Sequence, residues 1–134
     1  MFTEWNESHS VGVKRFDEQH KRLFDIINEL HRGITRGEGR ENTSAILRKL
    51  VAYVTEHFAD EERLMERYAF PALASHTAEH NRMREIILGF LGKFDQADAR
   101  MGEQMLSALT EWINSHVGGA DKQYGHFFNQ RGVY

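Results

Sequence analysis

The fold of this chain is decided by residues 47–68, which read LRKLVAYVTEHFADEERLMERY. Apolar residues recur in this stretch at intervals of three or four, at Leu47, Leu50, Val54, Leu64 and Tyr68. Such intervals place one apolar stripe along an α-helix that packs into a bundle. The same intervals pass through positions where the chain has His57 and Glu61 instead of leucine. The stretch therefore predicts a bundle helix with polar groups on its buried face.

Three further segments of the chain have the same helical periodicity. We expect helices from after Asp17 to the glycines at 37 and 39, from Thr43 to Tyr68, from Ala72 to Phe94 and from Gly102 to Val117, with a shorter helix from Ala120 to Phe128. Asp17 is assigned as the N-cap of the first helix, because aspartate caps well. Four helices with short links predict an all-α, antiparallel up-down-up-down four-helix bundle. We expect the first 16 residues to form an ordered N-terminal arm, and residues 1–134 to form a single domain.

The composition excludes several classes of function. The net charge of −3 gives no basic surface for nucleic acid. Cysteine is absent, which excludes disulfides, cysteine-ligated clusters and thiol catalysis. The single proline, Pro71, suits long helices, whose interiors proline breaks. No apolar run is long enough for membrane insertion and the chain does not begin as a signal peptide does, so we expect a cytoplasmic protein.

Polar residues interrupt all four predicted stripes. Stepping along the stripes lands on these residues in place of leucine: His20, His57, Glu61, His76, His80 and His116. A single buried histidine is usually a hydrogen-bonded core residue. Polar groups from four helices at once would be costly to bury without a strong shared partner. Metal ions provide such a partner, since imidazole and carboxylate are good metal ligands.

The spacing within two of the helices supports a shared metal site. Residues four apart lie one turn apart on the same helix face, so His57 and Glu61 can present two ligands together. His76 and His80 have the same spacing.

A further carboxylate, Asp121, follows His116 by five residues, which is off-register for one regular helix face. Gly118 and Gly119 lie between them and allow the helix to end or bulge there, so that Asp121 turns inward. Taken alone, this aspartate is better interpreted as a helix cap or a surface carboxylate than as a metal ligand.

Five histidines and two carboxylates exceed the needs of one metal ion. A zinc site takes three or four ligands, so seven suit two metals with bridging carboxylates. Nitrogen and oxygen ligands without sulfur fit iron, zinc, copper or manganese. The Glu-x-x-His motif of ferritin-like di-iron bundles is absent from the sequence, and so is His-Glu-x-x-His.

The chain resembles the hemerythrin family, and within it the single-domain bacteriohemerythrins. The resemblance covers nearly the whole chain, in order and with family-like spacing. Its matching stretches are Trp5-Asn6, Val11-Gly12-Val13, Phe16-Asp17-Glu18-Gln19-His20, His57-Phe58-Ala59-Asp60-Glu61-Glu62 with Met65 and Pro71, His76-Thr77-Ala78-Glu79-His80, Trp112-Ile113-Asn114-Ser115-His116, and Asp121 with Tyr124. It implies a non-haem centre of two iron ions, oxo- or hydroxo-bridged, that binds dioxygen reversibly.

The resemblance also implies a role for each metal ligand. The implied ligands, all present here, are His20, His57, Glu61, His76, His80, His116 and Asp121. The two carboxylates would bridge the irons, and the last three histidines would bind one of them. The other iron would have only His20 and His57 besides the bridges, which leaves a coordination position open for dioxygen.

Apolar residues beside the ligands are candidates for a wall that excludes water from the bound gas. We expect this wall to include Leu23, Phe24, Phe58, Trp112 and Val117. Each of these residues would fit ordinary bundle core equally well.

Ligating imidazoles need partners on their second ring nitrogen. The nearest polar candidates in sequence are Gln19, Glu62 and Tyr124. We interpret the run from Asp60 to Arg63, Glu62 included, as a solvated face except at Glu61. We expect the remaining histidines to lie on the surface, at His9 and His126, or at its boundary, at His31.

The implied function is that of an oxygen-binding protein rather than an enzyme, and no catalytic residue is predicted. We expect a monomer that carries or stores dioxygen, or delivers it to an oxygen-consuming enzyme or reductase. One alternative is a di-iron enzyme that acts on peroxide or nitric oxide, although no acid–base pair or substrate motif supports it. Another is an oxygen or iron sensor that works with a partner protein. Structural zinc in a plain bundle is disfavoured by the number of ligands.

Overall fold

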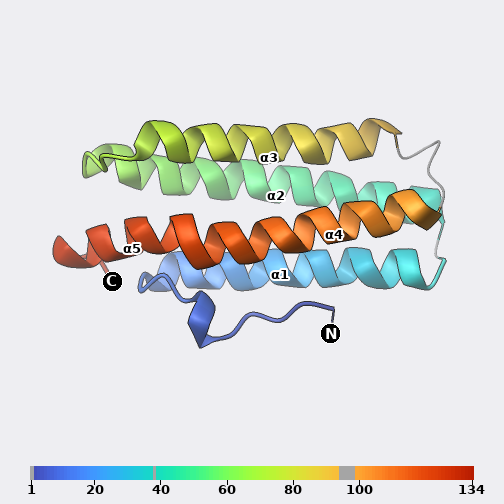
Figure 1. Ribbon diagram of the computed structural model, residues 1–134, viewed down its shortest axis with the longest axis horizontal. Coiled ribbons are helices and arrows are strands. Elements are labelled where there is room, and N and C mark those ends of the chain that lie inside the picture. Colours follow the sequence, from blue (N-terminus) through green and yellow to red (C-terminus); the bar gives the residue numbers. More distant parts are fainter. Residues whose placement is uncertain (1, 38, 94–98) are drawn as a thin grey trace.

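The computed structural model describes residues 2–37, 39–93 and 99–134, and every regular element in them is helical. Its long helices are α1 (Lys14–Thr35), α2 (Arg40–Arg67), α3 (Leu73–Lys93) and α4 (Ala99–Ser115). They lie side by side and alternate in direction, which confirms the predicted antiparallel four-helix bundle (Figure 1). The last helix continues through a π-helical segment, η3 (His116–Ala120), into α5 (Asp121–Gln130).

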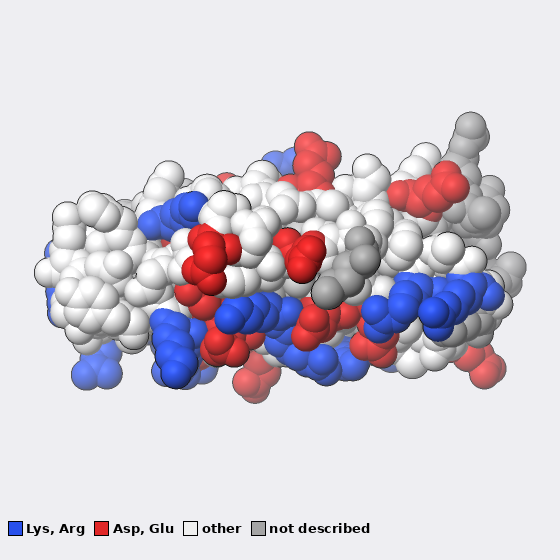
Figure 2. Space-filling model, turned by 90° about the horizontal axis from the view of Figure 1, so that it is seen from below, with Lys and Arg blue, Asp and Glu red and all other residues white. Residues whose placement is uncertain are grey.

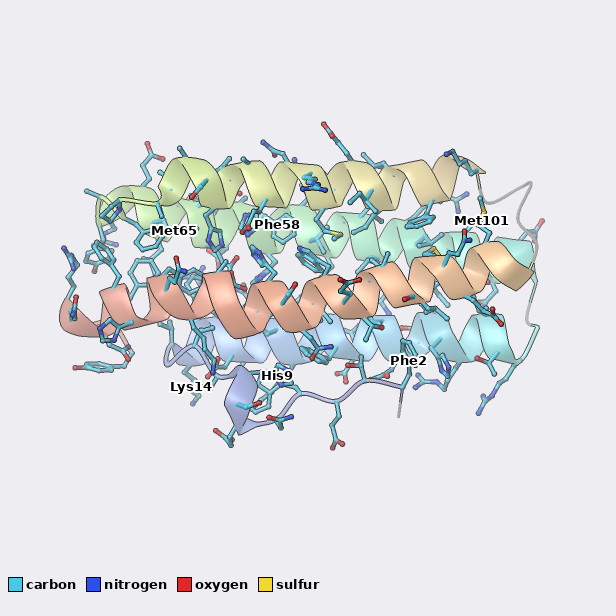
Figure 3. The ribbon with its side chains drawn as sticks, in the orientation of Figure 1. Phe2, His9, Lys14, Phe58, Met65 and Met101 are labelled. Atoms are coloured by element: carbon cyan, nitrogen blue, oxygen red, sulfur yellow. The ribbon has the colours of Figure 1, made fainter. Side chains whose placement is uncertain are left out.

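The predicted stripes form the core of the bundle, where each fully buried large apolar side chain contributes about 1.5–3 kcal/mol. The larger apolar cluster contains Leu23, Phe24, Ile26, Ile27, Leu30, Ile46, Leu47, Leu50, Val54, Phe58, Met83, Ile87, Met105, Leu106, Leu109, Ile113 and Val117. The smaller cluster contains Val11, Val13, Phe16, Met65, Phe70, Tyr124 and Phe128. Phe58 of the larger cluster and Met65 of the smaller one lie at different points along α2 (Figure 3).

Helix α1 begins earlier than predicted, at Lys14, and the assignment of Asp17 as its N-cap is wrong. Val13 occupies the cap position and makes no side-chain cap hydrogen bond. The carboxylate of Asp17 instead accepts hydrogen bonds from the backbone N–H of Val11 at 2.8 Å and from the hydroxyl of Ser10 at 2.6 Å. The aspartate therefore fastens the arm to the first turn of the helix.

The other helix boundaries differ from the predictions by a few residues. Helices α2 and α4 both begin three residues earlier than expected, at Arg40 and Ala99, and α5 ends at Gln130 rather than Phe128. The predicted end of the third helix, Phe94, lies outside the described residues. Helix ends are the least specified feature of a periodic pattern, because the apolar stripe continues to the last turn whichever residue caps it.

The N-terminal arm is ordered, as predicted, and includes the short 3₁₀ helix η1 (Glu7–His9). The backbone N–H of Thr3 donates to Asn28 on α1 at 2.9 Å, and the Asn28 amide donates back to the Thr3 carbonyl at 2.7 Å. His9 is buried, so its predicted surface position is wrong. Its Nδ1 accepts from the backbone N–H of Asn6 at 3.1 Å, and its Nε2 lies 2.9 Å from Asn114 Oδ1. The arm thus packs against both α1 and α4.

Helix α5 also packs tightly against the arm. A Cβ atom on Gly125 would lie 1.8 Å from the carbonyl oxygen of Val11, so only glycine fits at this crossing. The Asn129 amide adds a hydrogen bond to the carbonyl of Gly12 at 2.9 Å. These contacts fix the position of the helix that begins at Asp121.

The surface has mixed charge. Positive and negative side chains are interspersed over the face seen in Figure 2, without a large patch of one sign. Among the helices of the described residues, none combines the length and the apolar character that crossing a membrane requires.

Candidate metal centre

All seven predicted ligands converge in the interior of the bundle, between the two apolar clusters. They come from α1 (His20), α2 (His57, Glu61), α3 (His76, His80), η3 (His116) and α5 (Asp121). Each is at most 5% exposed. The structure thus brings the seven residues together, whereas their assignment as metal ligands stays a prediction.

The π-helical segment explains how two residues five apart both point inward. The backbone N–H of Asp121 donates to the carbonyl of His116, which is the i to i+5 hydrogen bond of a π-helix. Residues five apart then lie on consecutive turns, and Asp121 Oδ1 is 3.0 Å from His116 Nε2. The bulge expected at Gly118 and Gly119 is therefore confirmed.

Glu61 divides its two carboxylate oxygens between two groups of histidines. Its Oε2 atom is 3.1 Å from His20 Nε2 and 3.4 Å from His57 Nε2. Its Oε1 atom is 3.3 Å from His80 Nε2 and 4.0 Å from His76 Nε2. The carboxylate therefore faces one group with each oxygen.

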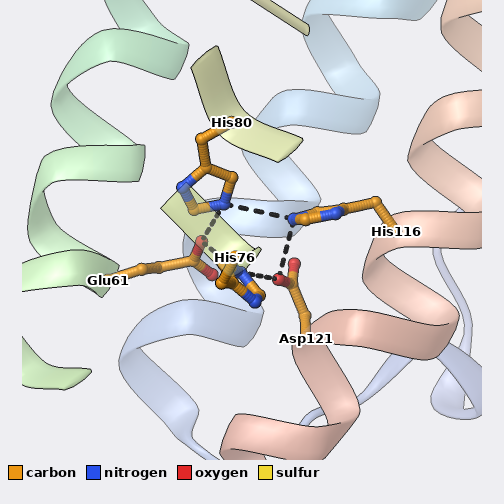
Figure 4. A group of neighbouring side chains, drawn as sticks. All are labelled: Glu61, His76, His80, His116 and Asp121. Carbon is orange, nitrogen blue, oxygen red and sulfur yellow. Dashed lines mark hydrogen bonds and ion pairs between the residues drawn. The ribbon is translucent and has the colours of Figure 1, made fainter. Parts of the chain in front are cut away.

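Asp121 divides its oxygens in the same way. Its Oδ2 atom is 3.1 Å from His20 Nε2, while its Oδ1 atom is 2.9 Å from His76 Nε2 and 3.0 Å from His116 Nε2. The Nε2 atoms of His80 and His116 face each other at 3.1 Å (Figure 4). Both carboxylates thus stand between the same two groups of imidazoles, as bridging ligands would.

These donor atoms form two groups in which all atoms lie within 4.8 Å of one another. One group has five donors, from Glu61, His76, His80, His116 and Asp121. The other has four donors, from His20, His57, Glu61 and Asp121. Below, they are called the five-donor group and the four-donor group.

The chemistry of the donor set fits metal ions. Glu61 Oε1, His76 Nε2 and both oxygens of Asp121 are buried without a hydrogen bond of normal geometry. Buried polar atoms are nearly always satisfied, so such a concentration calls for a partner other than the protein. Ligand atoms at right angles around a metal, with bonds of about 2.1 Å, stand about 3 Å apart, which is the spacing found here.

The electrostatics of the cluster leave the donors able to bind cations. Burial opposes ionisation of both Glu61 and Asp121, but the facing histidines outweigh it and hold the pKa of each carboxyl below its usual range. Burial lowers the pKa of His57 to about 4, so this imidazole is neutral at pH 7. Burial also opposes protonation of His20, but the facing carboxylates of Asp121 and Glu61 outweigh it and raise its pKa to about 10. A metal bound there would displace that proton.

The second ring nitrogens of three histidines have polar partners. His57 Nδ1 is 2.6 Å from Gln19 Oε1, and His80 Nδ1 is 3.2 Å from Glu62 Oε2. Glu62 therefore does not act only as a solvated surface residue, and that prediction is wrong.

The partner of His116 could not be found from the sequence. Its Nδ1 lies 3.2 Å from Glu79 Oε2, a contact between η3 and α3 that spacing along one helix does not indicate. Tyr124 contacts a carboxylate rather than a ring nitrogen, because its buried hydroxyl donates to Glu61 Oε2. Asp60 is also buried, at 8% exposure, which corrects its predicted solvated position.

Aromatic rings stack on two of the histidines in the five-donor group. The Phe58 ring lies parallel to His80, with centroids 3.9 Å apart, and Trp112 stacks on His116 at 5.3 Å. The other expected wall residues, Leu23, Phe24 and Val117, belong to the same larger cluster. That these side chains line a pocket for a ligand stays a prediction.

The two remaining histidines lie away from this centre. His31 is half-buried and stacks on Phe2 with centroids 4.2 Å apart, which matches its expected boundary position. His126 is exposed, as expected.

Comparisons of sequence and of structure with known proteins agree on one family. A family model described as the hemerythrin HHE cation binding domain matches residues 11–126, a range that contains all seven residues of the cluster. The bacteriohemerythrin of Methylococcus capsulatus is 31% identical over 109 residues, which cover 81% of this chain and 82% of that protein. The bacteriohemerythrin of Stenotrophomonas maltophilia is 28% identical over 120 residues, covering 90% and 77%. A crystal structure of wild-type hemerythrin has a TM-score of 0.83 at 27% identity, over 94% of this chain and 97% of that one.

Proposed function

The chain belongs to the hemerythrin family, and from this premise we propose that it binds dioxygen reversibly at a di-iron centre held by the seven convergent side chains. One observation carries the proposal: the five-donor and four-donor groups are unequal and share both carboxylates. With one donor fewer, the four-donor group offers the position at which a small gas can bind. Two iron ions bound in these groups would supply the redox chemistry by which dioxygen is taken up and released.

The protein holds its two carboxylates so that each can serve both groups at once. Tyr124 donates its hydroxyl to Glu61 Oε2, which restrains the side chain that faces His20 and His57. The π-helical hydrogen bond places Asp121 under His116. Because these restraints come from α5 and η3 rather than from the metal, the donor set is preorganised.

The make-up of the donor set favours binding over oxygen cleavage. Five of the seven donors are imidazoles and only two are carboxylates, so the set provides little negative charge to stabilise highly oxidised iron. Phe58 and Trp112 place apolar surface against His80 and His116. An apolar surround of this kind limits access of water to the centre.

The role we propose is to carry or store dioxygen, or to deliver it to an oxygen-consuming enzyme or reductase. The two relatives named above are called bacteriohemerythrins, which supports a binding role. A peroxide- or nitric oxide-reducing enzyme and an oxygen sensor are the outcomes against which this role is tested.

The test is an optical spectrum of the di-ferrous protein under nitrogen, then under air, then after degassing. We expect an oxygen-dependent charge-transfer band that reverses on degassing, and no such band in a zinc-loaded control. A missing or irreversible band would contradict the proposal. Sustained turnover with an electron donor, faster than autoxidation, would instead indicate an enzyme. A partner that binds only one oxygenation state would indicate a sensor.

A further inference from the structure

A chain of hydrogen bonds leads from the protein surface to His57. The side chain of Gln19 bridges α1 and α2: its Oε1 is 2.6 Å from His57 Nδ1, and its Nε2 is 2.7 Å from Asp60 Oδ2. Asp60 Oδ1 in turn accepts hydrogen bonds from Arg15 and, at 3.3 Å, from Arg63. Both arginines are exposed, whereas Asp60 is buried. The chain therefore runs from solvent to a histidine of the four-donor group.

Each hydrogen bond in the series from the arginines to His57 can form in only one direction. Arginine can only donate and an ionised carboxylate can only accept, so Asp60 must accept from the side-chain NH₂ of Gln19. The carbonyl of Gln19 then faces His57, and the orientation of the amide is fixed. A carbonyl can only accept, so Nδ1 of His57 carries the hydrogen. Its Nε2 is left with a free lone pair, 3.4 Å from Glu61 Oε2.

The backbone of Gln19 is also held in place. The hydroxyl of Tyr53 donates to the backbone carbonyl of Gln19 at 2.7 Å, and the Tyr53 ring lies parallel to His57 at 6.3 Å. Tyr53 therefore holds the backbone of Gln19 and lies beside the imidazole that the Gln19 side chain contacts. The opposite tautomer of His57 would direct an N–H at the donor cluster and could not bind a metal there.

We propose that Gln19 and Asp60 are positioning residues that hold His57 in the tautomer able to bind a metal in the four-donor group. The proposal rests on the metal centre proposed above. We expect these two residues to affect only one of the two metals, because the hydrogen bond that joins the Gln19 side chain to the cluster goes to His57. In the five-donor group, His80 and His116 instead face the carboxylates of Glu62 and Glu79 directly.

The test begins with Asp60→Asn, which keeps the shape of the side chain and adds a donor. The introduced amide can donate to Gln19, so the Gln19 amide can turn over and donate to Nδ1 of His57, leaving the hydrogen on Nε2. We expect the affinity for one of two Co²⁺ ions to fall by about 10–100-fold, with the other affinity unchanged. Both affinities are measured by titration against a competing chelator under nitrogen, with the visible absorption of Co²⁺ as the signal.

A second substitution, Gln19→Glu, is then added to Asp60→Asn. The introduced carboxylate can only accept, so it accepts from both neighbours and restores the hydrogen to Nδ1 of His57. We expect the double variant to recover the lost affinity to within a few-fold. In the zinc-loaded proteins, the His57 Nδ1–H signal in ¹H–¹⁵N spectra should weaken by exchange in the single variant and return in the double variant.

The matched control is Glu56→Gln, which removes one negative charge from the surface pocket that Gln19 and Asp60 line. It should leave both Co²⁺ affinities unchanged. The proposal is overturned if Asp60→Asn binds both ions as tightly as the parent, weakens both equally, or is not rescued by Gln19→Glu. Since dioxygen is absent throughout, a failure of oxygen binding would leave this result unaffected.

Discussion

Replacing Gly125 with alanine should destabilise the protein, although alanine is the better helix former. An ideal Cβ at this position lies 1.8 Å from the carbonyl oxygen of Val11 and 2.8 Å from its carbonyl carbon. Unstrained carbon–oxygen contacts are about 3.3 Å, so α5 or the arm must move by roughly 1.5 Å. The clash is between the backbone of α5 and the backbone of the arm, which cannot relax by side-chain rotation. We therefore place the overpacking cost at about 3 kcal/mol. The gain in helix propensity is about 1 kcal/mol, which leaves a net loss of about 2 kcal/mol.

The same movement should reach the metal centre. Helix α5 carries Asp121 and Tyr124, and a functional site tolerates displacements of only about 0.5 Å. A shift of α5 would therefore withdraw the Asp121 carboxylate from both donor groups. We expect the Gly125→Ala variant to lose iron to a chelator faster than the parent protein does.

The assay is urea denaturation of the metal-free proteins, with Gly89→Ala as the matched control. A Cβ at Gly89 meets nothing within 4 Å, so there alanine should stabilise α3 by about 0.5–1 kcal/mol. Both variants replace a helical glycine with alanine, but their changes in the free energy of unfolding should have opposite signs. If Gly125→Ala is as stable as the parent, the close packing of α5 on the arm is refuted.

Three other perturbations have defined outcomes. Glu61→Ala removes a donor from both groups, so elemental analysis should find fewer than two irons per chain; a parent-like content would contradict its bridging role. Phe58→Ala removes a fully buried ring and should cost about 3–5 kcal/mol in urea denaturation, far more than a surface substitution. The pKa of Glu61 and of Asp121 is lower in the folded state than in the unfolded chain. Their ionisation therefore stabilises the metal-free fold above about pH 4, and this stability should be lost as the pH falls further; a free energy of unfolding that stays constant there would contradict the shifts.

The positions of the five histidines in the cluster could be predicted because they depend on local geometry. Residues four apart share a helix face, so the spacing of His57 with Glu61 and of His76 with His80 is enough to indicate common sites. The inward position of Asp121 was harder to predict, since residues five apart share a face only in a π-helical segment. The glycines between them permit such a segment but do not require it.

Contacts between helices could not be predicted, because sequence spacing says nothing about which side chains face each other across an interface. Asp60 lies among charged residues and reads as solvated, yet Gln19 and Arg15 on α1 cover it. His9 reads as a surface residue until the arm folds back and places it beside Asn114. Both of these wrong predictions concern residues whose partners are distant in sequence.

Anomalous X-ray diffraction at the iron edge, on crystals of the iron-loaded protein, tests most directly whether the convergent side chains hold two irons. We predict two peaks that both lie between Glu61 and Asp121. One should be next to the three histidines of α3 and η3, and the other next to His20 and His57 with a coordination position left open. A single peak, or peaks away from the two carboxylates, would contradict the di-iron centre.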